Sequence, residues 1–174
     1  MDFDLGDEAK ELSAAPWGLN MAFRKIAFEK YGPFRTDLDL SGTNRLLGGD
    51  TEFGNRLMRA GERLLYAPSV IVFHPVEQKR ITRSYFLRYY FALGRTAVRE
   101  ESWPSEAVLY FGVPRYLYRS FLVKCANWLF SFDKKKRFYH KTRVYYVLGY
   151  IAEARKVKRD GSLGAQTIQS TRVI

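Results

Sequence analysis

The residues best suited to chemistry lie in one stretch, residues 48–75, which contains Asp50, Glu52 and His74. Asp50 follows two glycines and precedes an amphipathic segment. A carboxylate in that position either caps a helix by accepting backbone N–H bonds or acts as a general base. Glu52 in the first turn suits the helix dipole without any further role. His74 ends an apolar run, where a histidine is either a metal ligand or a packed or surface side chain.

The elements that must position Asp50 begin at residue 17. Residues 17–23 form an apolar, strand-like run, residues 24–31 predict a short helix that ends at Gly32, and residues 35–49 form a polar loop. From Asp50 onward, apolar residues recur with a helical period, and Gly61 is placed to end this helix as a C-cap.

His74 is preceded by a second strand-like segment. After a turn at Pro68, the β-branched run at residues 70–73 predicts a buried strand that ends at His74 and Pro75. The order is therefore a strand, a loop, a helix that begins near Asp50, and a strand that ends near His74.

This order and its motifs resemble the family 2 glycosyltransferases of GT-A fold. Residues 18–24 resemble the segment G-x-N-M-A-F-R that precedes the acceptor loop in that family. A second set resembles its acidic motif, the helix closure after it and the strand that ends in histidine: Asp50, Glu52, Arg56, Ala60, Gly61 and His74. The resemblance covers about residues 16–100.

The resemblance implies roles for individual residues. Asp50 would be the general base that deprotonates an acceptor hydroxyl as it attacks the anomeric carbon of a nucleotide-sugar, and direct displacement would invert that carbon. His74 would bind a divalent metal, Mg²⁺ or Mn²⁺, that neutralises the departing diphosphate. The sugar or acceptor pocket would be lined by Trp17, Asn20, Gly49 and Glu52.

The chain also departs from the family pattern. Gly49 stands where family members often carry an acidic residue. The family's nucleotide-binding half and its Asp-x-Asp motif are expected upstream, and the pair Asp2 and Asp4 has no preceding strand to position it. The sequence therefore predicts an α/β acceptor-side half of a GT-A domain that is inactive without a separate N-terminal half. The alternative is a non-catalytic remnant that binds a membrane or a partner protein.

The C-terminal part is expected to be helical. Residues 80–101 predict a long helix, on which Arg88, Arg95 and Arg99 share one face. Two further helices are predicted at about 106–132 and 134–158, followed by a disordered tail from 161. We therefore expect a glycosyltransferase part at residues 1–103, a basic aromatic helical region at 104–160 and a tail at 161–174.

The net charge of +11 is concentrated in this helical region. Residues 1–103 hold 15 Lys/Arg and 14 Asp/Glu, whereas residues 104–174 hold 14 and 4. Basic side chains interleaved with aromatic rings suit an anionic membrane surface, and they also suit single-stranded nucleic acid. A helical hairpin that simply exposes its charges gives the same pattern. Nucleic acid is disfavoured because the region around Asp50 is nearly neutral.

Composition restricts the class of protein. With 47% hydrophobic and 16% aromatic residues, the chain can bury a sizeable core and is not of the disordered class. Charges interrupt every apolar run before the roughly 18 residues of a membrane span. The single Cys125 and the acidic first residues, which lack signal-peptide order, favour a cytoplasmic protein, at most peripheral on the inner face of the membrane.

Overall fold

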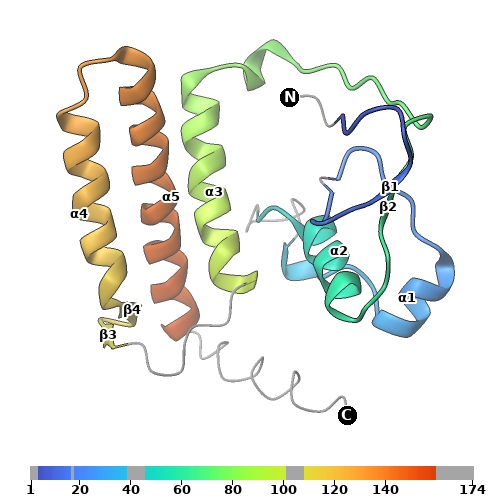
Figure 1. Cartoon of the computed structure of the whole chain (residues 1–174). Helices are drawn as coiled ribbons and strands as arrows, with labels where there is room; N and C mark the ends of the chain where they lie inside the picture. The colour runs from blue at the N-terminus through green and yellow to red at the C-terminus, as the bar shows by residue number, and fades with distance from the viewer. Residues whose placement is uncertain (1–3, 17, 39–45, 101–107, 160–174) are drawn as a thin grey trace. The chain divides into compact units, whose positions relative to one another are not determined.

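A computed structural model of the chain describes residues 4–16, 18–38, 46–100 and 108–159. These residues form five α-helices, two short 3₁₀ helices and two antiparallel sheets of two strands each (Figure 1). The fold is mixed α/β and rich in helix. The chain divides after Val76 into two units, each described by itself below, whereas the sequence suggested a boundary at residue 103.

In the first unit, the N-terminal segment pairs with the chain that follows the second helix. Strand β1 (Lys10–Glu11) is antiparallel to β2 (Leu65–Tyr66), and the backbone N–H of Leu12 donates to the Leu64 carbonyl at 2.8 Å. The Leu12 side chain is buried. Residues 10–12 are therefore attached to this unit by backbone hydrogen bonds and by the buried Leu12 side chain.

The two helices predicted in the first unit are confirmed. Helix α1 (Lys25–Tyr31) precedes the 3₁₀ helix η1 (Thr36–Leu38), and α2 (Gly49–Arg59) begins one residue before Asp50. Gly61 has a φ of 83°, a backbone conformation that favours glycine and ends the helix as expected. These helices are joined by a cluster of four phenylalanine rings in mutual contact, of which Phe53 is fully buried: Phe23, Phe28, Phe34 and Phe53.

Within the described residues, neither of the strands predicted at 17–23 and 70–73 is present. Trp17 lies outside the described residues, and residues 18–23 form a turn followed by irregular backbone. Residues 70–73 have no strand partner and are exposed, with Phe73 at 92%. The prediction of a buried strand there was wrong, because high β-propensity produces a strand only where a neighbouring strand accepts its hydrogen bonds.

The second unit is a three-helix arrangement centred on its last helix. Helix α3 (Arg83–Glu100) follows the 3₁₀ helix η2 (Gln78–Arg80), and it packs along α5 (Lys134–Arg159), which also contacts α4 (Arg115–Leu129) (Figure 1). The helices predicted at 80–101 and 134–158 are confirmed. Among the described residues, no helix is long and apolar enough to cross a membrane.

A β-hairpin occupies the start of the segment for which the sequence predicted one helix over 106–132. Strands β3 (Leu109–Tyr110) and β4 (Val113–Pro114) are antiparallel, and α4 begins only at residue 115. The two turn residues, Phe111 and Gly112, have φ values of 51° and 79°. Positive φ at both positions matches the twist of a two-residue hairpin, although phenylalanine is an unusual residue there.

Helices α3 and α5 approach closely because each presents a glycine at their contact. A Cβ atom at Gly94 would overlap the carbonyl oxygen of Tyr146, and one at Gly149 would overlap the carbonyl oxygen of Phe91. The contact is therefore reciprocal, with each glycine lying against the backbone of the other helix. It positions the buried residues Ala97, Val98, Tyr150 and Ala154 in one core.

We expect Gly149→Ala to destabilise the protein by about 1–3 kcal/mol, because the added methyl group forces the two backbones apart. Helix propensity alone predicts the opposite sign, since alanine is favoured over glycine by about 1 kcal/mol inside a helix. Urea unfolding followed by far-UV circular dichroism measures the difference. An increase in stability would contradict the close contact.

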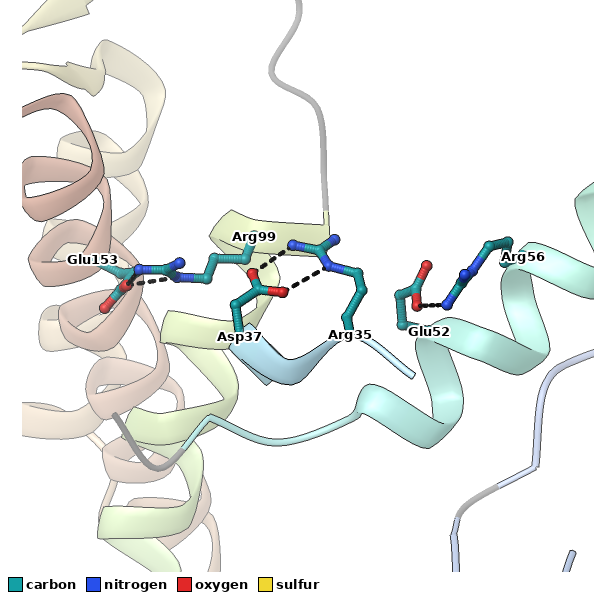
Figure 2. Close-up of polar contacts among 6 residues, drawn as sticks. All are labelled: Arg35, Asp37, Glu52, Arg56, Arg99 and Glu153. Carbon is teal, nitrogen blue, oxygen red and sulfur yellow. Dashed lines mark hydrogen bonds and ion pairs between the residues drawn. The ribbon is translucent and has the colours of Figure 1, made fainter. Parts of the chain in front are cut away.

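A buried carboxylate lies beside this contact. Glu153 on α5 is 1% exposed, and it accepts a hydrogen bond from Arg95 Nε at 2.8 Å. It also accepts hydrogen bonds from Arg99 Nε and Nη2 at 2.8 and 2.6 Å (Figure 2). Burial alone would raise the pKa of Glu153, but the hydrogen bonds and charges of the two arginines outweigh it and lower the pKa below its ordinary value. Arg95 and Arg99, which the sequence placed on one helix face, therefore point inward.

Candidate functional site

Asp50 lies in the first turn of α2 and is half-buried. The N-cap of the helix is Gly48, whose φ of 93° gives the chain its sharp entry into α2. Asp50 is therefore not the N-cap, although its Oδ1 accepts a hydrogen bond from the Thr51 backbone N–H at 2.8 Å. Within the described residues, its second oxygen, Oδ2, has no hydrogen-bond partner.

The glycine of the segment that resembles G-x-N-M-A-F-R lies directly against this carboxylate. A Cβ atom at Gly18 would overlap Asp50 Oδ2. No side chain larger than hydrogen fits at Gly18 without moving Asp50. Two motifs that are 32 positions apart in the sequence therefore meet at one oxygen atom.

Asn20 links the same segment to the chain that leads to His74. Its side-chain Nδ2 donates to the backbone carbonyl of Val70 at 2.8 Å. This bond holds the exposed residues 70–73 beside the turn at residues 18–20. The structure thus gives Asn20 a definite partner, but that partner is a backbone group, so the bond itself serves to position the chain.

Gly49 is a close-packing position. A Cβ atom there would lie 3.0 Å from the Leu38 carbonyl oxygen and 3.5 Å from that of Arg35, so the start of α2 rests on the backbone of η1. An acidic side chain at this position, as often found in the family that the sequence resembles, would need extra space at this contact. Beside it, Arg35 and Asp37 form a two-bond ion pair, with Nη2 and Oδ2 2.7 Å apart (Figure 2).

Glu52, expected to line the acceptor pocket, is paired with Arg56 one turn later on α2 (Figure 2). Glu52 Oε2 accepts from Arg56 Nη2 at 2.8 Å, and the same guanidinium donates to the carbonyls of Tyr31 and Pro33. It also lies over the Phe53 ring, 5.0 Å from the ring centroid. These contacts connect α2 to the end of α1 and support a structural role for Glu52.

The end of α2 is held to α1 by a further polar group at the surface. Glu62 accepts hydrogen bonds from Tyr31 Oη and from Lys30 Nζ. These bonds lower the pKa of Glu62, with Tyr31 the larger cause, and bonds to Tyr31 and Glu62 raise the pKa of Lys30. Together with Arg56, this group fixes the direction in which α2 presents Asp50.

His74 is exposed within the irregular segment 67–77. Among the described residues, no group of three or more His, Cys, Asp or Glu side chains could hold a metal ion. A lone imidazole is a poor site for Mg²⁺ or Mn²⁺, because these cations prefer several oxygen ligands. The described residues by themselves do not fit the divalent metal that the resemblance implies.

The structure thus brings Gly18, Asp50, Asn20 and the approach to His74 into one region of the first unit. Trp17, expected in the sugar pocket, lies outside the described residues. The buried Glu153 was missed by sequence reasoning, although the spacing of Arg95 and Arg99 on one helix face signalled a shared partner. Comparison of the chain with protein-family models, with curated proteins and with solved structures gives no match.

Proposed function

We propose that the chain is the acceptor-side part of a glycosyltransferase similar to family 2 enzymes of GT-A fold, with Asp50 as its general base. One observation carries the proposal: three motif-like segments that are separate in sequence meet in the first unit. Gly18 lies against Asp50 Oδ2, and Asn20 bonds the chain that leads to His74. Such meeting of distant segments supports a common site.

The two oxygens of Asp50 suit different tasks. Oδ1 accepts the Thr51 N–H, which fixes the orientation of the carboxylate. Oδ2 then takes the proton of the acceptor hydroxyl while the acceptor oxygen bonds to the anomeric carbon. The bond from that carbon to the diphosphate breaks, and the nucleoside diphosphate leaves with the electron pair. A single displacement of this kind inverts the anomeric carbon.

Gly18 contributes because it has no side chain. Any side chain at this position would push against Oδ2, so glycine lets the carboxylate stay in its bonded orientation. Arg56 and Glu62 contribute indirectly, since their contacts fix α2 on α1.

Donor binding requires a further part. The described residues contain only two-stranded antiparallel sheets, whereas the nucleotide-binding part implied by the resemblance alternates strands and helices. We therefore place the nucleotide-sugar on a separate N-terminal half and the hydroxyl acceptor on this chain. The reaction needs both parts.

The test is a transfer assay with the purified chain and a panel of radiolabelled nucleotide-sugars and hydroxyl acceptors. We expect no transfer from the chain by itself. We expect transfer when a nucleotide-binding N-terminal half of a family 2 glycosyltransferase is expressed with it as one protein or as two. Transfer by the chain alone would contradict the division of labour, and no transfer from the combined parts would contradict the glycosyltransferase proposal.

A further inference from the structure

The turn between α4 and α5 exposes three large apolar side chains to solvent. Leu129 at the end of α4 is 60% exposed, and Phe130 and Phe132 in the turn are 76% and 99% exposed. Exposing phenylalanine to water is unfavourable, and here two such rings lie two positions apart. Isolated exposed apolar residues are ordinary on proteins, but a cluster at the tip of a helical turn indicates a contact surface.

Four basic side chains follow directly in the first turn of α5. Lys134, Lys135, Lys136 and Arg137 are all exposed, and among the described residues none of the four is in an ion pair. The one acidic residue in the turn, Asp133, accepts the Lys136 backbone N–H at 2.8 Å as a cap of α5. The turn therefore combines apolar rings with a strong positive charge.

The start of α3 lies at the same end of the second unit as the start of α5 (Figure 1). Side chains from both helix starts line a groove. The groove has a volume of about 280 Å³. Its lining is half cationic and half apolar: Arg83, Lys134 and Lys135, with Ile81, Phe86 and Phe138. The Arg83 guanidinium lies 5.7 Å from the centroid of the Phe138 ring, which keeps this cation at the groove.

We propose that this end of the second unit docks on an anionic lipid bilayer. Phe130 and Phe132 insert among the lipids at headgroup depth, and residues 134–137 pair with headgroup phosphates. The groove takes one of these phosphates between Arg83 and the two lysines, with the start of its acyl chains against Ile81 and Phe86. The proposal does not depend on the transferase chemistry, because every residue in it belongs to the second unit.

The arrangement fits lipid better than single-stranded nucleic acid. A nucleic-acid track spaces its aromatic rings along a basic groove, so that successive bases can stack. Here Phe130 and Phe132 lie in one turn next to the aliphatic Leu129 and directly before the basic run at residues 134–137. The other highly exposed ring of this unit, Phe111, lies apart from them in the turn between β3 and β4. Exposed apolar side chains in a turn, followed directly by basic side chains, are typical of a peripheral membrane contact.

The test is sedimentation of the full chain with vesicles of phosphatidylcholine alone or with about one-third phosphatidylglycerol. Three variants are compared with the wild type. The first replaces Lys134, Lys135, Lys136 and Arg137 by Gln, and the second is Phe130→Ala with Phe132→Ala. The third is a charge-matched control that replaces four exposed arginines elsewhere by Gln: Arg24, Arg59, Arg115 and Arg119.

We expect the wild type to bind anionic vesicles and to bind neutral ones much more weakly. Each cation engaged at an anionic surface strengthens binding by about fivefold. Removing the four charges at residues 134–137 should therefore weaken partitioning onto anionic vesicles by at least about tenfold. The charge-matched control should change this partitioning by less than about threefold, because charges far from the vesicle surface are screened by salt. The double phenylalanine variant should release fully in high salt, where the wild type stays partly bound.

Circular dichroism checks that each variant is folded. We expect all of them to fold, because every substituted side chain is exposed. Equal losses from the basic-run variant and the charge-matched control would overturn the proposal, because binding would then follow net charge and not this surface. Equal sedimentation with neutral and anionic vesicles would overturn it too. So would weak vesicle binding together with tight, salt-sensitive binding of an oligothymidylate probe.

Discussion

Replacing Asp50 by asparagine in the proposed transferase, tested together with its N-terminal half, is expected to lower the turnover rate by a factor of about 10²–10⁴, the usual contribution of a general base. Asparagine keeps an oxygen for the Thr51 N–H and has nearly the same shape, so α2 should remain in place. It cannot accept the acceptor's proton. Turnover and the dissociation constant of the nucleotide-sugar are measured on the same preparations, and only turnover should change.

The matched control is Asp7→Asn, which makes the same chemical change at an exposed position. It should leave turnover within about twofold of the wild type, as expected for a surface change away from the site. If Asp50→Asn weakened nucleotide-sugar binding as much as turnover, Asp50 would be a structural residue of α2. That outcome would remove the base from the proposed reaction while leaving the fold of the first unit as described.

Replacing Glu153 by alanine is expected to lower the free energy of unfolding by about 3–5 kcal/mol, the typical loss when one partner of a buried ion pair is removed. The side chains of Arg95 and Arg99 are only 19% and 15% exposed. Without Glu153, both guanidinium groups lose the carboxylate that offsets their desolvation. Urea unfolding of the variant and the wild type measures the loss.

The acid dependence of stability is the second measurement on Glu153. The pKa of Glu153 is lowered in the folded protein, so its contribution is fully present above the ordinary value of 4.5 and is lost as the pH falls through the folded pKa. Below pH 4.5, the wild type should therefore lose more stability than Glu153→Gln, which has no proton to gain. Parallel curves for the two proteins would contradict the ion-pair account.

A triple variant separates charge from packing. Glu153→Leu combined with Arg95→Leu and Arg99→Leu removes all three charges together. Replacing a whole buried ion-pair group by apolar residues is often neutral or stabilising, so this variant should recover most of the stability lost in Glu153→Ala. Failure to recover it would mean that the space around Glu153 matters more than its charge.

The sequence predicted α3 and α5 well because their signals are local, whereas it missed the hairpin before α4. The basic run at residue 134 marks the start of α5, and the apolar period of residues 83–100 marks α3. The end of α2 at Gly61 is equally local, since only its own φ is involved. The strand at residues 70–73 failed because a strand needs partners elsewhere in the chain, which the run itself does not encode.

The candidate site was predictable as a set of residues and not as a set of contacts. Resemblance selected Asp50 and Gly18 from separate motifs, but only the structure places them against each other. Glu52 is acidic and lies near Asp50 in sequence, yet it pairs with Arg56 because residues four apart share a helix face. The close contact of Gly49 with Leu38 likewise depends on tertiary structure.

The glycine contact between α3 and α5 has a consequence for how the second unit forms. Helix α4 contributes one buried residue, Leu117, so most of the packing joins helices that are not consecutive in the chain. The contact between α3 and α5 requires closure of the segment from Glu100 to Lys134. This closure costs chain entropy before the burial of apolar surface can offset it. During synthesis, α3 leaves the ribosome long before its partner exists. Its apolar face stays open to chaperones or to wrong partners until α5 has emerged.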